Sequence, residues 1–193
     1  MSKTQTLQIL VEIPEGTNVK YEYDDKTGRI YVDRIVPTPM KYPTNYCSIE
    51  GAMGKDGDLM DALLLTAEPI MPGMWVKGRA IGMLEMEDEE GVDNKIICVL
   101  EKAKQDAVCG SWENITDVPE HWLNKIKHFF EHYKDLEKGK WVKINRFLDK
   151  DAAEKELEEA MQKMKEECDC DCKGGDDCKC EDGCSCCGEC GCK

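Results

Sequence analysis

The sequence predicts a mainly β fold, a small β-barrel with two helices packed outside it. Short β-prone segments lie close together along the chain, turn-forming residues separate them, and two helical apolar stripes lie in the second half. Strands at this spacing are typical of a barrel, and amphipathic helices need an apolar surface to cover. At 193 residues, the chain has room for one ordinary domain with a single core.

The first three strands form the predicted N-terminal part of the domain. Leu7–Ile13 has apolar residues at every second position, which predicts a strand, and Glu12 lies on the other face, pointing away from the isoleucine side. Two β-prone segments follow, Lys20–Asp24 and Arg29–Arg34, and the turn-forming residues Asp-Lys-Thr-Gly join them into a predicted hairpin. Because side chains alternate along a strand, Lys20 and Glu22 share one face of this hairpin.

A proline-spaced loop and the remaining elements follow. The loop covers residues 36–46, and further β-prone segments are Met74–Met86, Lys95–Leu100 and Trp141–Phe147. A helix is expected to begin near Asp117 and Pro119. Its apolar stripe consists of Trp122, Ile126, Phe129, Phe130 and Tyr133. A second helix is expected over residues 151–167, with Ala153, Leu157, Met161 and Met164 facing inward.

The charge and hydropathy patterns exclude several classes of protein. A net charge of −14 argues against a nucleic-acid partner, because binding a polyanion depends on Lys and Arg that neutralise phosphates. No apolar stretch approaches the roughly 18 residues that span a bilayer, and the N-terminus has no signal-peptide pattern. We therefore expect a cytoplasmic protein without a membrane partner. On composition alone, the acidic charge indicates only solubility.

The densest chemical signal is a short acidic segment before an apolar run. Asp56, Asp58 and Asp61 lie within six residues, and residues 62–65 follow as a strand-like segment. Carboxylates at this density repel one another, and oxygen-only ligands favour Mg2+ or Mn2+ over Zn2+. The EF-hand spacing is missing. A solvated acidic turn explains three aspartates equally well when they are taken alone.

Further charged residues extend this signal to a site for cations and phosphate. Asp88 and Asp93 flank a second acidic group, and Lys95 follows it. Basic and tyrosine side chains elsewhere suit anionic oxygens. Neither a Walker A sequence nor a glycine-rich dinucleotide fingerprint is present. The three histidines, His121, His128 and His132, lie in or beside one predicted helix, which gives poor support to serine- or cysteine-based hydrolysis.

Ordered motifs over residues 7–165 show that the sequence resembles the family I, prokaryotic-type inorganic pyrophosphatases. The family signature D-G-D-P-x-D-x-L-V-L appears here as DGDLMDALLL. The segments EIP, KYE, DR, YPxNY and HFFEHYKDLEKGKWVK occur in the expected order. The resemblance implies an OB-like five-stranded β-barrel flanked by two helices, a homo-oligomer (a hexamer in prokaryotes), and hydrolysis of pyrophosphate to two phosphates.

The resemblance also implies a role for each matched polar residue. Divalent cations, Mg2+ or its substitute Mn2+, would be held by Asp56, Asp61, Asp88, Asp93, Glu22 and Glu12. The two phosphoryl groups would be held by Lys20, Arg34, Tyr46, Lys95, Tyr133 and Lys134. The cations neutralise the polyanion and activate a water, and Asp58 is expected to act as the base or orienting group for that water.

Two departures from the family pattern lie close to these residues. Leu59 replaces a proline in the signature, and Cys47-Ser48 replaces Gly-Tyr after Tyr46. Neither change removes a ligand, so we expect activity to survive. A rival hypothesis is a catalytically weak scaffold that buffers metal through its C-terminus. The presence of all matched polar positions favours the enzyme.

The cysteines divide the chain into a predicted pyrophosphatase domain, 1–167, and a cysteine-rich tail, 168–193. Cys47, Cys98 and Cys109 are scattered and are expected to be small buried residues. The tail has no aromatic or aliphatic residue to build a core, so it is either disordered and redox-labile or ordered by Zn2+, Cu+ or Cd2+. It resembles a metallothionein-like segment, and its candidate ligands are Cys168, Cys170, Cys172, Cys178, Cys180, Cys184, Cys186, Cys187, Cys190 and Cys192.

Overall fold

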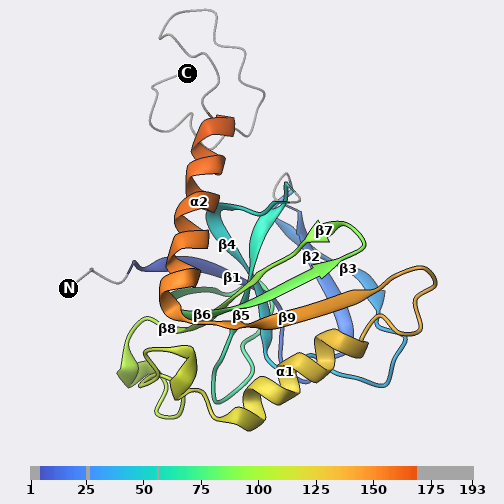
Figure 1. Cartoon of the computed structure of the whole chain (residues 1–193), viewed down its shortest axis with the longest axis horizontal. Coiled ribbons are helices and arrows are strands. Elements are labelled where there is room, and N and C mark those ends of the chain that lie inside the picture. Colours follow the sequence, from blue (N-terminus) through green and yellow to red (C-terminus); the bar gives the residue numbers. More distant parts are fainter. Residues whose placement is uncertain (1–4, 25–26, 56, 169–193) are drawn as a thin grey trace, which may run out of the picture.

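The computed structural model describes residues 5–24, 27–55 and 57–168 (Figure 1). Two helices cover a β-structure, as the sequence predicts. The helices are α1 (Glu120–His132) and α2 (Lys150–Cys168), with short 3-10 turns at Ala103–Gln105 and Ile115–Asp117. The strands are β1 (Leu7–Ile13), β2 (Val19–Asp24), β3 (Arg29–Ile35), β4 (Asn45–Met53), β5 (Leu59–Leu64), β6 (Trp75–Asp88), β7 (Gly91–Val92), β8 (Lys95–Leu100) and β9 (Val142–Leu148).

Five strands close into a barrel in the order β1-β4-β5-β8-β6, because β6 also pairs with β1. The pairing between β5 and β8 is parallel, and the other four pairings are antiparallel. β7 and β9 extend the sheet from β6. Closure removes the free sheet edges of these five strands. The predicted small β-barrel with flanking helices is therefore confirmed.

Strand β4 is the main element that the sequence reasoning missed. Its first residues, Asn45 and Tyr46, were assigned to the end of the proline-spaced loop, and no strand was expected beyond them. The segment contains Gly51 with φ +74°, which interrupts the alternation that marks a strand. Its pairing with β1 on one side and β5 on the other holds it in the sheet.

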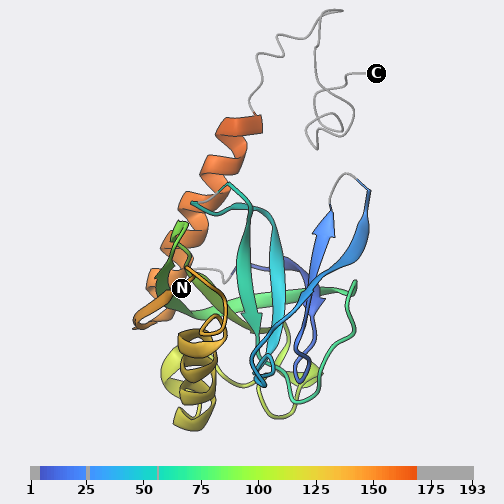
Figure 2. The same ribbon diagram turned by 90° about the vertical axis from the view of Figure 1, so that its right-hand side faces the viewer.

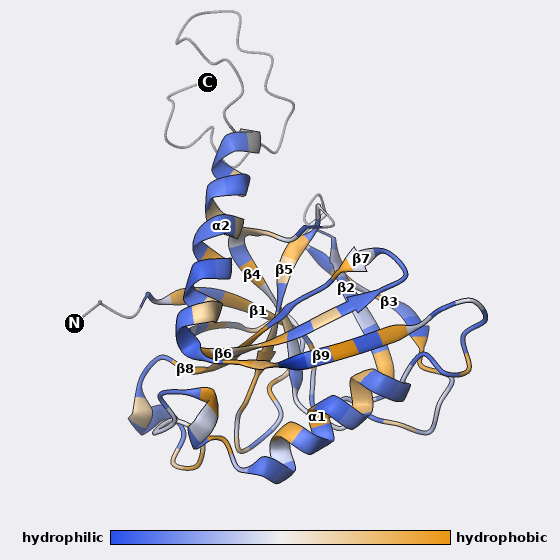
Figure 3. Cartoon of the chain, viewed as in Figure 1, coloured by the Kyte–Doolittle hydropathy of each residue, from blue (hydrophilic) through white to orange (hydrophobic). Residues whose placement is uncertain are grey.

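Each helix covers one of two hydrophobic clusters. On α1, Ile126, Phe129 and Phe130 are buried, which confirms the centre of the predicted stripe. On α2, Ala153 and Leu157 are buried as predicted. Figure 3 shows that α2 is otherwise mostly hydrophilic, so a narrow apolar face attaches it to the barrel.

The inward assignment of Met164 on α2 needs correction, whereas that of Met161 holds only at the edge of the core. Both side chains are only partly buried, and Ala160, 5% exposed, occupies the core face instead. Met161 packs at the edge of the cluster, whereas Met164 lines a cavity. The reason is that the barrel surface ends before α2 does, so the last turns of the helix extend past the core (Figure 1).

The predicted hairpin forms a separate two-stranded ribbon, β2–β3, beside the barrel (Figure 2). Lys20 lies opposite Arg34 in its register, and an irregularity follows between Lys20 and Tyr21. Gly28 adopts φ +64° in the turn and donates its N–H to the carbonyl of Asp24 at 2.8 Å. The ribbon therefore presents charged residues to the barrel from outside it.

The three cysteines of the domain are buried, each 0% exposed: Cys47, Cys98 and Cys109. This confirms that they pack as small apolar residues. Within the described ranges, no helix has the length and apolar character needed to cross a membrane. The tail cysteines lie outside the residues whose side chains are described.

Candidate active site

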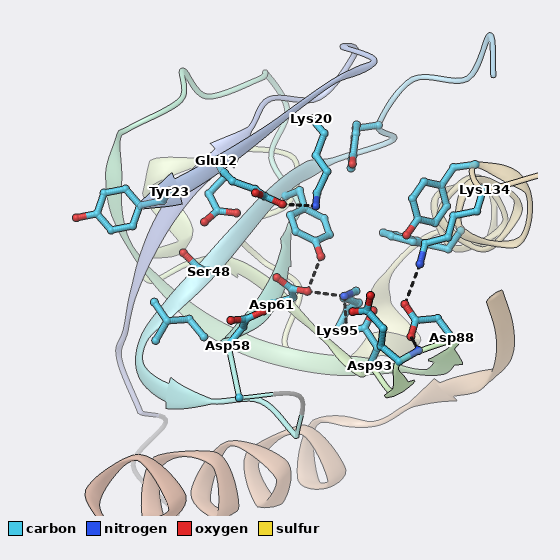
Figure 4. Close-up of a pocket in the computed structure, with 18 of the residues that line it drawn as sticks. Glu12, Lys20, Tyr23, Ser48, Asp58, Asp61, Asp88, Asp93, Lys95 and Lys134 are labelled. Carbon is cyan, nitrogen blue, oxygen red and sulfur yellow. Dashed lines mark hydrogen bonds and ion pairs between the residues drawn. The ribbon is translucent and has the colours of Figure 1, made fainter. Parts of the chain in front are cut away.

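One cavity of about 580 Å³ lies between the barrel, the ribbon and the end of α1. It collects every residue predicted for the pyrophosphatase site whose structure is described. These residues are Glu12, Lys20, Glu22, Arg34, Tyr46, Asp58, Asp61, Asp88, Asp93, Lys95, Tyr133 and Lys134. Asp56 lies outside the described residues. Segments far apart in the sequence thus place their polar side chains in one cavity (Figure 4).

Lys95 lies at the centre of the acidic side of this cavity (Figure 4). It is 2% exposed and forms ion pairs with Asp61 and Asp93. Burial disfavours its charged form, but the two carboxylates outweigh this effect and raise the pKa of Lys95 above its ordinary value. The ammonium is therefore charged at neutral pH.

The parallel pairing of β5 with β8 explains this arrangement. Ala62 lies opposite Ile96, so the preceding residues of the two strands, Asp61 and Lys95, are neighbours. Tyr46, from β4, donates its hydroxyl hydrogen to the same Asp61 carboxylate. Burial holds the pKa of Tyr46 well above its usual value, and Asp61 adds to this effect, so the group remains a phenol donor.

A second buried ion pair lies beside Lys95 and its two partners, toward the end of α1 (Figure 4). Lys134, just after α1, contacts Asp88 at 2.9 Å and Glu89 at 3.1 Å. Lys140 also contacts Glu89 at 2.9 Å. Burial opposes the ionisation of Glu89, but hydrogen bonds from the two lysines and the backbone outweigh it and lower its pKa to about 2. The two lysines are thereby fixed at the cavity wall.

The ribbon contributes a third group of charges. Lys20 contacts Glu22 at 2.6 Å and Asp33 at 3.5 Å, and Arg34 contacts Asp33 at 2.6 Å. Arg34 also approaches Glu137, with its Nε 3.6 Å from a carboxylate oxygen. Asp33 therefore holds the two cationic side chains side by side at the edge of the cavity.

Glu12 lies inside the cavity, where burial and the negative charge of Asp61 outweigh the opposing effect of Lys20 on its pKa. Burial raises its pKa to about 7, and the negative charge of Asp61 adds to this effect. Glu12 therefore changes its charge close to neutral pH. The predicted orientation of Glu12 away from the isoleucine side of β1 is consistent with this position.

The donor set fits a hard divalent cation. Seven described carboxylates line the cavity, and no cysteine or histidine does. Within the described parts of the chain, no three His, Cys, Asp or Glu side chains form a ready-made cluster. Lys95 occupies the position between Asp61 and Asp93 instead.

Several residues of the cavity were missed by the sequence reasoning. Ser48, Tyr42, Glu90, Lys140 and Met164 also line it. Lys140 lies within the matched segment HFFEHYKDLEKGKWVK, and that match could have identified it. Ser48 is one of the two departures from the family pattern and is 4% exposed, so the substituted side chain lies in the cavity wall. Leu59, the other departure, lines the cavity at the start of β5.

A closed barrel with a cavity in which carboxylates face lysine, arginine and tyrosine defines a hydrolase for a small phosphate anion. The inorganic pyrophosphatase family model matches residues 9–165. The chain is 48% identical over 157 residues to the inorganic pyrophosphatase of Nanoarchaeum equitans, covering 81% of this chain and 96% of that protein. It is 46% identical to the Thermoplasma volcanium enzyme over 160 residues, with 83% and 94% covered.

The fold agrees with solved structures of the same class. The Helicobacter pylori inorganic pyrophosphatase superposes with a TM-score of 0.81 at 41% identity, covering 86% of this chain and 96% of that one. The chain therefore belongs to the inorganic pyrophosphatase family and is an enzyme that hydrolyses inorganic pyrophosphate. Membership of this family of enzymes favours catalysis over the rival hypothesis of a weak scaffold.

Glu12 makes the stability of the metal-free protein depend on pH. Its folded-state pKa of about 7 exceeds the unfolded value of 4.5, so the stability it contributes is complete below 4.5 and is lost as pH rises through 7. Glu12→Gln removes the ionisable group, so the variant does not lose this stability as pH rises. From pH 5 to pH 8, the variant should gain on the order of 2 kcal/mol in unfolding free energy relative to wild type. Urea unfolding at several pH values measures the difference.

The control for this measurement is Glu50→Gln, on the exposed side of β4. The difference in unfolding free energy between Glu50→Gln and wild type should stay constant from pH 5 to pH 8. If the stability of Glu12→Gln runs parallel to that of wild type, the titration has been assigned to the wrong carboxylate.

Proposed function

We propose that this pyrophosphatase is Mg2+-dependent, with Mn2+ as an alternative, and that its cations bind among the carboxylates of the described cavity. The observation that carries the proposal is the composition of that cavity, which combines carboxylate oxygen ligands with fixed cationic side chains. A bound divalent cation would neutralise the substrate and activate a water. The cation ligands we propose are Asp56, Asp61, Asp88, Asp93, Glu22 and Glu12.

The cationic and tyrosine residues have the complementary role of holding pyrophosphate. Lys134 and Lys95 are both less than a tenth exposed, so their ion pairs hold each charge at a defined position before substrate arrives. Preorganised charges stabilise the charge that develops on the leaving phosphate without reorganising during the reaction. We assign the phosphoryl contacts to Lys20, Arg34, Tyr46, Lys95, Tyr133 and Lys134.

Asp58 is the proposed base or orienting group for the attacking water. It lines the cavity and is exposed, so solvent can reach its carboxylate. The turn that carries it is closed by a hydrogen bond from the Gly54 N–H to the Asp58 carbonyl at 2.7 Å. Asp58 thus combines a fixed backbone with an accessible side chain, as proton abstraction from water requires.

Removing divalent cations should abolish hydrolysis. The proposed ligands are all oxygens, so chelation with EDTA should reduce phosphate release to background, and added Mg2+ should restore it. The measurement is phosphate release from pyrophosphate by purified protein. Substantial turnover by metal-stripped protein would end the metal-dependent proposal, although it would leave the family assignment intact.

Asp58→Asn should lower kcat by about 10²-fold or more and change KM little, because the amide cannot take a proton. Lys134→Ala is the contrasting variant, since losing a substrate contact should raise KM as well as lower kcat. Steady-state kinetics separate the two patterns, and circular dichroism checks the fold. Near-full activity of Asp58→Asn with an unchanged spectrum would show that another group activates the water.

We also propose that the tail, 168–193, is a separate soft-metal segment after the pyrophosphatase domain, 1–167. Its cysteine density supports this proposal, and so does the family match, which ends at residue 165. Thiolates prefer Zn2+, Cu+ or Cd2+, whereas the cavity offers oxygen ligands. The two sites should therefore select different metals.

Deleting residues 168–193 should leave Mg2+-supported hydrolysis largely unchanged, because every proposed active-site residue precedes the deletion. The full-length protein should bind several Zn2+ or Cd2+ ions that the truncated protein does not, and acid should release them as the thiolates protonate. Metal analysis after anaerobic reconstitution compares the two proteins. Equal metal content would refute the role of the tail, and loss of hydrolysis would refute its independence.

The oligomeric state of the protein and its cellular location are predictions from the sequence. The resemblance implies a homo-oligomer, a hexamer in prokaryotes, and exposed apolar side chains such as Met71 (74%) and Trp75 (47%) are compatible with a subunit contact. A cytoplasmic location rests on the sequence pattern alone.

A further inference from the structure

One carboxylate outside the cavity contacts both of its acidic loops. Glu156 of α2 is 13% exposed. One of its oxygens lies 2.9 Å from the Lys55 ammonium and accepts a hydrogen bond from the Asn94 side-chain amide at 3.2 Å. Lys55 belongs to the turn between β4 and β5, and Asn94 to the segment between β7 and β8. A single oxygen atom thus joins two loops that are about 40 residues apart in the sequence.

Both partners of Glu156 are sequence neighbours of proposed cation ligands. Lys55 precedes Asp56, and Asn94 follows Asp93. Asn94 is itself fixed, because its side-chain oxygen accepts the Met86 N–H at 3.2 Å, and the Asp93 N–H donates to the Met86 carbonyl at 3.0 Å. A displacement of Asn94 would therefore also displace the backbone of Asp93.

A second residue of α2 reinforces the first loop. Lys163 donates from its ammonium to the Gly54 carbonyl at 2.7 Å. It lies about two helical turns after Glu156, so the two side chains share a face of α2. Gly54 also closes the turn through its hydrogen bond to Asp58. The loop that carries Asp58 is thus tied to α2 at two successive residues, Gly54 and Lys55.

The helix provides a rigid support for these contacts. Ala153, Leu157 and Ala160 bury one side of α2 against the barrel, where the helix contacts β4 and β6. A small hollow separates the two loops and is lined by Lys55, Asn94 and Glu156 together with Asp61 and Asp93. The contacts of Glu156 therefore lie directly behind the carboxylates of the cavity.

We propose that Glu156 is a positioning residue for the hydrolysis, because it sets the separation of the two acidic loops and hence of the carboxylates that bind cations. This proposal rests on the metal-dependent function proposed above. Carboxylates from two loops can hold one cation only at a suitable separation, so displacement of either loop would weaken binding. The two contacts of Glu156 oppose such displacement, and Glu156 itself is only 13% exposed, although Lys55 is 53% exposed.

Glu156→Gln tests this role with little change of shape. The variant weakens the contact with Lys55, so the first loop is no longer fixed relative to Asp93. The dissociation constant for Mn2+, measured without substrate by calorimetry, should rise on the order of tenfold, the low end of losses for partners behind metal ligands. The Mg2+ concentration for half-maximal activity should rise in parallel, and saturating Mg2+ should restore most of kcat. The matched control is Glu159→Gln, on the same helix, whose carboxylate pairs with exposed Lys155.

Loss of negative charge alone could also weaken cation binding, and Lys55→Met separates the two explanations. Electrostatics alone predicts tighter Mn2+ binding when a nearby positive charge is removed. Positioning predicts weaker binding, because the loop loses its tether to Glu156. The double variant should bind no more weakly than the weaker single variant, since both changes break the same contact.

Each outcome decides the proposal. Weaker Mn2+ binding in both Glu156→Gln and Lys55→Met, with unchanged circular dichroism and an unchanged Glu159→Gln control, supports it. Unchanged binding in Glu156→Gln, or tighter binding in Lys55→Met, overturns it. If Glu156→Gln does not fold, the exposed Lys55→Met decides alone. Hydrolysis by metal-free wild type would refute the metal-dependent function instead, so the two failures are distinguishable.

Discussion

The contact of Lys95 with Asp61 and Asp93 is the interaction on which the rest of the cavity depends. These three side chains are brought together at low exposure, and carboxylates so close would repel one another without a compensating cation. The ammonium supplies that charge from within the fold. The compensation is present at neutral pH, because the two carboxylates raise the pKa of Lys95 despite its burial. The cavity can therefore hold many charged groups before any ligand binds.

Barrel closure makes this contact possible. Asp61 and Lys95 are neighbours because β5 and β8 pair in parallel, and β6 pairs with the other edge of β8 and with β1 to close the barrel. The same closure places Asp88, at the end of β6, within reach of Lys134. The electrostatic pattern of the cavity is thus a consequence of strand register, and a shift of one residue would turn Asp61 away from Lys95.

Much of the fold followed from local patterns in the sequence. The alternation of Leu7–Ile13, the hairpin turn and the apolar stripe of α1 each depend on neighbours within a few residues, and all three were predicted correctly. Strand β4 was missed because its stability comes from pairing with β1 and β5 rather than from its own pattern. The site residues could be predicted because they belong to the matched motifs. Periodicity alone would not have identified them.

The sequence predicted that α2 packs on the core, and this is correct for the face that carries Ala153 and Leu157. Its apolar residues form a recognisable stripe, but the partners of a polar helical residue depend on which loops the fold brings beside it. Glu156 and Lys163 look like solvated charges in the sequence, whereas both contact the loop before β5. Preorganisation of an active site requires that the backbone around it resist displacement when charges change. The barrel, the ribbon and the end of α1 supply the charges of the cavity, and α2, which contributes no carboxylate to it, contacts the loop that carries Asp58.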